Sequence, residues 1–256
     1  MAPLSVTIIT RNESAHIEAC LASVEWADER LVVDCGSTDG TVALAERAGA
    51  RVVVNDWPGY AAQKNFAAGQ AAHDWILSVD ADERVTPELA REIQQLLGSS
   101  PTSPGYRLPR LTWHLGRWFR TTDWYPDHQL RLYDRRRGRW KLRRVHESVD
   151  VDGQPGYLVH HLEHYAYRDI AHHIETMNRY TTLAADDMFA SGRRVGAAAV
   201  IAHPIAAFLR NYLLKRGIFD GVPGFIVSAM NAYYVFLKMA KLWERARLER
   251  HGSGSA

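Results

Sequence analysis

The N-terminal part of the sequence predicts an α/β fold with an open, doubly wound and mainly parallel sheet. Two observations carry this prediction. Short apolar runs rich in β-branched residues alternate with segments of helical periodicity, which is the pattern of parallel strands joined by crossover helices. The apolar runs are also nearly continuous, as expected for strands buried on both faces of a sheet. Such sheets bind ligands at the carboxyl ends of their strands.

Each element of this sheet has a local justification. The predicted strands are residues 5–10, 31–34, 51–54 and 75–79. The first helix is expected near residues 17–24, where Ile17, Leu21 and Val24 share a helical face. A second, 41–48, is closed by Gly49 as a left-handed cap, and a third covers 60–70. A fourth, 87–97, has a proline at its start and a glycine after its end.

Composition sets wide limits. The 256 residues are 46% hydrophobic and 23% charged, which is ordinary for a globular protein and argues against general disorder. A formal charge of +2 points to no class of partner. Two cysteines are too few for a disulfide framework, so we expect a reduced, cytoplasmic setting. Residues 1–10 lack the basic start of a signal peptide, and 251–256 are expected to be a tag remnant.

The loop 99–105, rich in Ser, Pro and Gly, divides the predicted domain. We expect a domain over 1–165, made of the half 1–98 and a second half, 106–165, rich in Trp, Tyr, Arg and His. A helical C-terminal region is expected over 166–250, with a helix at 168–189 and helical stretches in 195–248 that are broken at Pro, as at Pro204, and at Gly. The two halves and the C-terminal region are therefore expected to differ in function.

Asp80-Ala81-Asp82 is the strongest local feature, because it follows the fourth predicted strand. Two carboxylates one residue apart at the end of a buried strand can hold one hard cation, and Mg²⁺ and Mn²⁺ prefer such oxygen ligands and share them with phosphates. The cation would neutralise charge on a departing diphosphate. The alternative is a solvated loop or a helix cap.

Two further loops end the first and second strands. In 34–41, Asp34 can accept from a base N–H, and Asp39 can bind a ribose hydroxyl. The alternative is that Ser37, Thr38 and Asp39 only cap the following helix. The loop Thr10-Arg11-Asn12-Glu13 would lie beside it, or be a simple turn and helix start. Lys64, on the third helix, can reach a base or a diphosphate, or is simply solvated.

The motifs IITRNE, VVDCGSTDGT, QKN and LSVDADE, in this order and spacing, resemble family 2 glycosyltransferases with the GT-A fold. The later segments WYPDHQLRLYDRR, RRVHESV, LEHYAYRD and NRYTTLAA resemble the bacterial subgroup of lipopolysaccharide-core heptose β-1,4-glucosyltransferases. The first four motifs cover roughly residues 4–97. The resemblance implies a GT-A domain, which the helical C-terminal region follows.

The resemblance also implies roles for single residues. Asp34 would read the base, and Lys64 would lie near the base or the phosphates. Asp80 and Asp82 match the metal and diphosphate motif, with Mg²⁺ or Mn²⁺ as the cofactor. His164 is the candidate for a further, late metal ligand, with Tyr/His packing as the alternative. The nucleotide-sugar site would comprise Thr10, Asn12, Glu13, Asp34, Ser37, Asp39, Lys64 and Asp80.

The resemblance implies an inverting displacement, in which a carboxylate deprotonates the acceptor hydroxyl. The Glu-Asp pair that opens a helix in many members is not found here. The candidates are Glu147, which follows a basic segment, and Asp127, which follows a proline and could be a turn residue. For both, the alternative is loop capping or pairing with arginines. Donors in the family are usually UDP-sugars, so UDP-glucose is the first choice.

A basic run covers 135–144, with seven positive charges in ten residues, and suits phosphate groups. A phosphorylated lipid or anionic membrane is favoured over nucleic acid, and a solvated hairpin paired with acids is the alternative. The arginines assigned to acceptor phosphate or membrane are Arg135, Arg136, Arg137, Arg139, Arg143 and Arg144.

The tail contains two uncharged stretches, 195–209 and 221–237, of 15 and 17 residues. Both are shorter than the ~20 residues of a spanning helix. Flanking basic residues and aromatic side chains predict helices that lie on a membrane, with a dimer interface or ordinary core as the alternative.

The sequence therefore predicts a metal-dependent, inverting enzyme on the cytoplasmic face of the inner membrane. It would move a sugar, first of all glucose from UDP-glucose, onto a lipid-linked saccharide such as the lipopolysaccharide inner core, with no nucleic-acid partner and an open oligomeric state. Two alternatives remain: a catalytically silent, membrane-binding GT-A-like module, and an enzyme for a polyprenyl-phosphate or other envelope acceptor. A nucleotidyltransferase is disfavoured, because TRNES after the first strand lacks the usual glycines.

Overall fold

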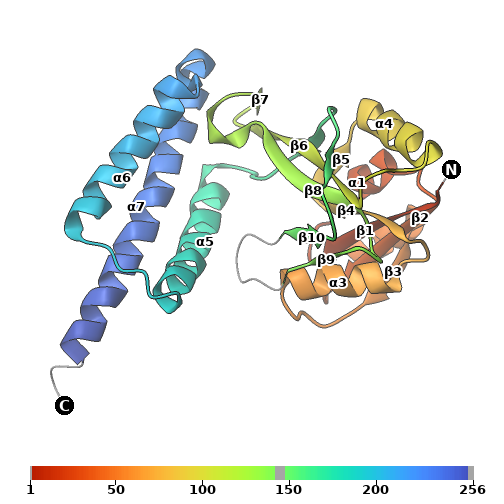
Figure 1. Ribbon diagram of the computed structural model, residues 1–256, viewed down its shortest axis with the longest axis horizontal. Helices are drawn as coiled ribbons and strands as arrows, with labels where there is room; N and C mark the ends of the chain where they lie inside the picture. Colours follow the sequence, from red (N-terminus) through yellow and green to blue (C-terminus); the bar gives the residue numbers. More distant parts are fainter. Residues whose placement is uncertain (1, 142–147, 253–256) are drawn as a thin grey trace. The chain divides into compact units, whose positions relative to one another are not determined.

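The computed structural model describes residues 2–141 and 148–252. The chain forms two compact units (Figure 1). Residues up to 112 join residues 127–166 in the first unit, and residues 113–126 join the chain from 167 onward in the second. The segment 113–126, which the sequence places in the second half of the first domain, therefore belongs to the helical unit.

The first unit is built on a mixed, mostly parallel sheet in the order β3-β2-β1-β4-β8-β6-β12-β5. Its parallel core is β3 (Arg51–Val54), β2 (Glu29–Asp34), β1 (Leu4–Thr10) and β4 (Trp75–Asp80), which confirms the four predicted strands. The carboxyl ends of these strands share one edge, because Thr10 is paired with Asp34 and Ile9 with Asp80.

The second half of the sheet is added largely in the opposite direction. Strand β8 (Asp127–Asp134) runs antiparallel to both β4 and β6 (Gly105–His114). Strand β12 (Leu162–His164) pairs in parallel with β6 and antiparallel with β5 (Glu83–Val85). The short strands β7 (Arg117–Phe119) and β11 (Gly156–Tyr157) pair with β6, while β9 (Gly138–Trp140) and β10 (Val149–Val151) form a separate ribbon.

Helices cover both faces of the parallel strands, as the continuous apolar runs predict. On one face, Val6, Ile8 and Leu77 pack with α1 (Ile17–Ser23) and α4 (Pro87–Gly98). On the other, Val33 and Ile76 pack with α3 (Tyr60–Gln70). Helix α2 (Thr41–Arg47) contacts α1 and β3. Helix α4 begins where predicted, since Thr86 Oγ1 accepts a hydrogen bond from Leu89 N and Pro87 occupies its first turn.

The second unit is helical. It contains the 3₁₀ turn Thr122–Trp124, α5 (Ile170–Ala190), α6 (Ala197–Leu209), a π-helical turn (Arg210–Leu214), a second 3₁₀ turn (Gly217–Asp220) and α7 (Gly221–Gly252). Helix α7 packs against both α5 and α6. Asp169 caps α5 by accepting a hydrogen bond from His172 N.

The expected break at Pro204 is wrong, because this residue lies inside α6. The proline removes one backbone donor, but the helix continues on both sides and packs along α7. Together with the π-helical turn it gives one run, Ala197–Leu214, that by length and composition could cross a membrane; its mean hydropathy is 1.3 and 6% of it is buried.

A cluster of aromatic and histidine side chains holds the start of α5 to the segment 113–126. His173 stacks on Tyr167 with 3.9 Å between ring centroids, and His114 meets the edge of both rings at 5.1 and 5.2 Å. His114 and His173 are 1% and 3% exposed. His114 Nε2 and His173 Nδ1 are buried and make no hydrogen bond within the described chain. Such a cluster favours neutral histidines.

We expect His173 to make this unit sensitive to acid. Burial, followed by the neighbouring His114 and His172, lowers the pKa of His173 from 6.5 to about 4. Its contribution to stability is therefore complete above pH 6.5 and is lost as the pH falls from 6.5 toward 4. The free energy of unfolding is expected to fall by about 2–3 kcal/mol in this window through His173. Thermal unfolding followed by circular dichroism between pH 4 and pH 7 measures it.

His173→Phe keeps the stacked ring without a titrating group, so its melting temperature is expected to fall less steeply over this window. His203→Phe, at an exposed position on α6, is the control and is expected to keep the wild-type profile. Equal slopes for His173→Phe and the wild type would contradict the assignment.

Candidate functional site

The first two loops at the carboxyl edge of the sheet form one wall. Asn12 N donates to Ser37 Oγ and Thr38 N donates to Asn12 Oδ1, both at 2.8 Å. Asn12 has a φ of 57°, a left-handed conformation that asparagine tolerates better than most residues. Glu13 N donates to Thr41 Oγ1 at 2.9 Å, which ties the first loop to the start of α2. The structure therefore brings together the loops that the sequence predicts to be neighbours.

The two acids of this wall mainly organise its backbone. Asp34 Oδ2 accepts hydrogen bonds from Gly36 N and Ser37 N at 2.8 Å, and Asp34 Oδ1 accepts one from Ser37 Oγ. A carboxylate has about four acceptor sites, so one on Asp34 is left for a base N–H. The hydroxyl of Thr41 and then other donors, offset in part by burial, hold the pKa of Asp39 below its usual range. Asp39 Oδ1 accepts a hydrogen bond from Thr41 N at 3.1 Å, next to Gly40, which is the N-cap of α2.

Thr10 lies beneath this wall at the end of β1. Its side chain is 5% exposed, and its Oγ1 makes no hydrogen bond with any described residue. A buried hydroxyl without a partner is rare in proteins, and a ligand is one of the groups that can satisfy it. This fits the prediction that Thr10 borders the nucleoside.

Asp80 ends β4 between two cations. Asp80 Oδ1 lies 2.8 Å from Lys64 Nζ, and Asp80 Oδ2 lies 2.5 Å from Arg131 Nη2. Burial alone would raise the pKa of Asp80, but Arg131 and Lys64 outweigh it and hold the pKa well below its usual range. Lys64 is 6% exposed, and its Nζ lies 4.5 Å from the centre of the Trp140 ring. A solvated role for Lys64 is therefore wrong.

Glu83, which the sequence analysis missed, is the centre of this charge network. It is fully buried, and its Oε1 accepts from Arg131 Nη2 at 3.0 Å and from Arg110 Nη1 at 3.2 Å. Its Oε2 accepts from Asp80 N at 2.8 Å. Arg110 Nη2 continues the chain to Asp127 Oδ2 at 2.7 Å. Charges of opposite sign thus alternate along Lys64, Asp80, Arg131, Glu83, Arg110 and Asp127.

Asp127 begins β8 on the same edge as Asp80, because β8 runs antiparallel to β4. Burial would raise the pKa of Asp127, but Arg110, followed by the hydrogen bond from Gln129, lowers it. Asp127 is therefore ionised at neutral pH. The other candidate base, Glu147, lies outside the described residues, as do Arg143 and Arg144.

Asp82 and His164 face each other beside this network. His164 Nε2 lies 3.4 Å from Asp82 Oδ2, and His164 is held by the pairing of β12 with β5. His164 Nδ1 is buried without a hydrogen-bond partner among the described residues. Burial would raise the pKa of Asp82, but His164 outweighs it and lowers the pKa.

A metal would find two of the three predicted protein ligands at this point. Among residues 2–141 and 148–252, no group of three His, Cys, Asp or Glu side chains is gathered for a metal ion. Asp80, the third predicted ligand, does not join Asp82 and His164, because both oxygens of its carboxylate face cations. A carboxylate oxygen suits Mn²⁺ or Mg²⁺ when phosphate and water complete the coordination, whereas an imidazole nitrogen suits a transition-metal ion rather than the hard Mg²⁺. Asp82 therefore fits either ion, and the pair Asp82 and His164 fits Mn²⁺ better than Mg²⁺.

The basic run lies elsewhere on the sheet. Arg135 donates to Ala68 O and Ala71 O at 2.9 and 2.6 Å, and Arg136 pairs with Asp134 at 2.6 Å. These contacts match the alternative for the basic run, a hairpin whose arginines pair with neighbouring groups. Arg137 Nη2 donates to Asp152 O, and Arg139 is exposed on the ribbon.

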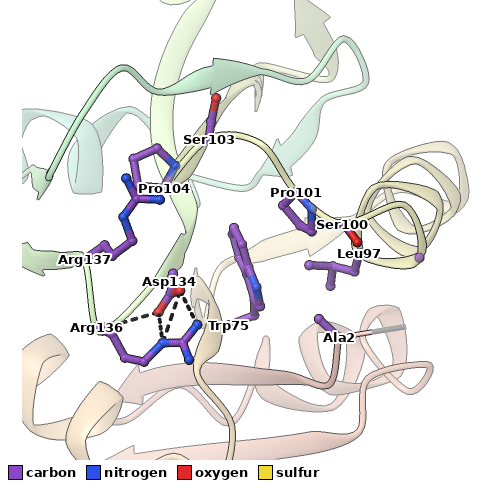
Figure 2. Close-up of a pocket in the computed structure, with 11 residues that line it drawn as sticks. Ala2, Trp75, Leu97, Ser100, Pro101, Ser103, Pro104, Asp134, Arg136 and Arg137 are labelled. Carbon is purple, nitrogen blue, oxygen red and sulfur yellow. Dashed lines mark hydrogen bonds and ion pairs between the residues drawn. The ribbon is translucent and has the colours of Figure 1, made fainter.

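Figure 2 shows Arg136 and Arg137 around a pocket of about 470 Å³ with Trp75, the first residue of β4, in its wall. Asp80 is the last residue of the same strand, roughly 17 Å away at about 3.3 Å per residue. Arg135, Arg136 and Arg137 thus lie at the opposite end of these strands from the charge network. Arg139 instead adjoins Trp140, whose ring lies 4.5 Å from Lys64 Nζ.

Comparison with known proteins agrees with the four motifs. Residues 5–165 match Glycosyl transferase family 2. The chain is 36% identical over 255 residues to the lipopolysaccharide core biosynthesis glycosyltransferase LpsC of Rhizobium meliloti, covering 96% of this chain and 94% of the relative. It is 33% identical to an uncharacterised glycosyltransferase of Rickettsia felis, covering 95% and 90%.

Solved structures are matched over shorter stretches. Glucosyl-3-phosphoglycerate synthase from Mycobacterium tuberculosis, in complex with Mn²⁺, UDP and glucosyl-3-phosphoglycerate, is 26% identical over 44% of each chain, with a TM-score of 0.36. TarS of S. aureus is 24% identical, covering 45% of this chain and 22% of that one, with a TM-score of 0.37. The chain thus spans less than half the length of either structure.

The family match spans the four motifs IITRNE, VVDCGSTDGT, QKN and LSVDADE, and the mixed, mostly parallel sheet with a helical C-terminal region is the GT-A type of fold. The expected family, fold class and enzyme class are confirmed. The chain therefore belongs to glycosyl transferase family 2 and is a glycosyltransferase.

Proposed function

We propose that the protein transfers a sugar from a UDP-sugar, with UDP-glucose the first choice, to a lipid-linked saccharide with inversion at the anomeric carbon. The observation that carries the proposal is the pair Asp82 and His164, 3.4 Å apart, beside the charge-locked Asp80 at the carboxyl edge of the parallel strands. The likeness over most of its length to a lipopolysaccharide core enzyme supports the acceptor class.

Asp82 Oδ2 and His164 Nε2 would hold Mg²⁺ or Mn²⁺. The ion, when bound, neutralises charge on the diphosphate leaving group. The wall of Asn12, Ser37 and Asp39 would border the nucleoside, with Glu13 beside it and Asp34 offering its remaining acceptor site to the base. Lys64 and Arg131 keep positive charge next to Asp80, and two further nitrogens of Arg131 are buried without a hydrogen-bond partner in the described chain. The negatively charged diphosphate of a nucleotide-sugar suits these unpaired N–H groups.

Asp127 or Glu147 would accept the proton of the acceptor hydroxyl as its oxygen bonds to the anomeric carbon and the bond to UDP breaks. The pair of Arg110 with Asp127 at 2.7 Å supports this role for Asp127, because it holds the carboxylate at the edge of the sheet where Asp80 lies. Replacing Asp127 by asparagine keeps the shape but removes the basic oxygen.

A panel of UDP-sugars with Mn²⁺ or Mg²⁺ and no acceptor tests the donor site, with UDP release as the readout. We expect slow release from one sugar and its loss on addition of EDTA. No release from any sugar, combined with no UDP binding by calorimetry, would support the alternative of a catalytically silent module.

The choice of base is tested with the same readout. We expect Asp127→Asn to slow UDP release by about 10²-fold, because the base also deprotonates water in the slow hydrolysis, and to leave UDP affinity unchanged. Glu147→Gln is the matched variant. A full rate for Asp127→Asn together with a slow Glu147→Gln would assign the role to Glu147.

A lipid-linked acceptor would place the enzyme on the cytoplasmic face of the inner membrane as a peripheral protein. A polyprenyl-phosphate or another envelope acceptor is the alternative within the same chemistry. Product analysis with a heptose-terminated core lipopolysaccharide and with a polyprenyl phosphate distinguishes the two.

A further inference from the structure

The turn that joins α6 to α7 exposes an unusual amount of apolar surface. We call residues 213–222 the hairpin tip. Leu214 and Phe219 are each 79% exposed and Val222 is 71% exposed. Leu213 and Ile218 are 52% and 45% exposed. Single exposed apolar residues are common, but a contiguous group marks an interaction surface.

The exposure is built into the fold, because the backbone of the hairpin tip is held firmly. A side chain at Gly224 would place its Cβ 1.9 Å from Gly217 O, so the two segments touch through their backbones. Thr122 N donates to Lys215 O at 2.9 Å. Arg117 Nη2 lies 2.5 Å from Asp220 Oδ1. These contacts lock the backbone of the tip while its apolar side chains stay in solvent.

The exposed charge at the tip is positive. Lys215 and Arg216 are exposed, and the one acid of the tip, Asp220, is 6% exposed and paired with Arg117. A second copy of this chain is disfavoured as the occupant, since a symmetric contact through the tip would bring Lys215 and Arg216 of both copies together. Apolar side chains beside two cations match the acyl boundary and head groups of an anionic leaflet.

A stripe along α6 continues the apolar surface of the tip. Ile201, Ile205 and Leu209 are 67%, 57% and 47% exposed and recur every four residues, so they lie on one side of the helix. Helix α6 contributes no buried residue. The run Ala197–Leu214 has 18 residues and a length of about 27 Å, below the ~30 Å of a bilayer core. It therefore suits a membrane surface better than a crossing.

We propose that the hairpin tip inserts into the interface of an anionic bilayer, with the α6 stripe lying along it and Lys215 and Arg216 at the head groups. The proposal rests on the proposed function only in that a lipid-linked acceptor explains why the enzyme needs a membrane. Its partner is the lipid surface itself, and no protein is required.

Sedimentation with vesicles tests the proposal on the full chain. We expect binding to vesicles of phosphatidylglycerol and phosphatidylcholine in equal parts, and much weaker binding to phosphatidylcholine alone. The double variant Leu214→Ser/Phe219→Ser is expected to lose about tenfold or more of its partitioning, because two apolar side chains no longer leave water. Lys215→Ala/Arg216→Ala is expected to lose binding to the anionic vesicles while keeping the residual binding to phosphatidylcholine.

Leu248→Ser is the matched control, since Leu248 is 64% exposed on α7 but lies outside the tip and the stripe. It is expected to bind like the wild type. Equal binding by the tip variant and the wild type would overturn the proposal. The proposal would also be overturned if the wild type did not bind vesicles and light scattering showed a dimer for the wild type but a monomer for the tip variant. UDP release, measured without vesicles, reports on the donor site separately, so failure of one proposal does not imply failure of the other.

Discussion

Asp82→Asn is expected to reduce metal-dependent UDP release by about 10²- to 10³-fold, because several kcal/mol of charge stabilisation on the leaving group would be lost. The same variant is expected to unfold within about 1 kcal/mol of the wild type, since its contact with His164 is a partly exposed pair at 3.4 Å. UDP calorimetry with and without EDTA, next to the release assay, measures the effect.

Asp150→Asn is a suitable control for Asp82→Asn. Asp150 is an exposed aspartate on β10 that pairs with Lys141 at 3.1 Å, so its loss changes the formal charge equally. We expect it to keep the wild-type rate. If Asp82→Asn bound UDP equally well with and without EDTA, at wild-type affinity, the metal role of Asp82 would have to be abandoned.

Glu83→Ala is expected to lower the free energy of unfolding by about 3–5 kcal/mol. The substitution leaves Arg131 and Arg110 in place without their shared carboxylate, and removing one partner of a buried ion pair leaves charge uncompensated. Asp80 N also loses its acceptor. Chemical denaturation measures the change, and the midpoint should fall without a change in slope.

The comparison for Glu83→Ala is Glu88→Ala, which removes an exposed pair with Arg91 at 3.0 Å on α4. Such surface pairs contribute about 1 kcal/mol or less. A Glu83→Ala midpoint as high as that of Glu88→Ala would show that the network contributes little to stability.

Much of the fold was readable because its signals are local. Apolar runs, the proline in the first turn of α4 and the glycine after α2 each act within a few residues. The neighbourhood of Thr10 and Asp34 also followed from the sequence, because parallel strands align their carboxyl ends. The rest depended on strand direction. Since β8 runs antiparallel to β4, its start brings Asp127 to the edge of the sheet where Asp80 lies, and its end carries Arg135 away from that edge.

The charge network was hidden for a similar reason. Arg131 stands between Leu130 and Leu132 in a buried strand, and Arg110 lies among the apolar residues of β6. A charge inside an apolar strand signals a buried partner, but which acid it meets depends on the order β4-β8-β6, which no local pattern contains. The same lack of long-range information explains why the grouping of residues 113–126 with the helical unit could not be predicted.

Because residues 113–126 belong to the second unit, they determine where the chain can be truncated. A chain that stopped at 166 would leave Asp123 without the Asn211 side chain that accepts from its backbone, and Arg117 without Asp220. The first unit is therefore not a continuous N-terminal fragment of the chain. Because Arg110 pairs with Asp127 across two antiparallel strands, a short turn from Thr112 to Asp127 would join β6 to β8 directly. The first unit should be excised by that replacement together with removal of the residues after 166.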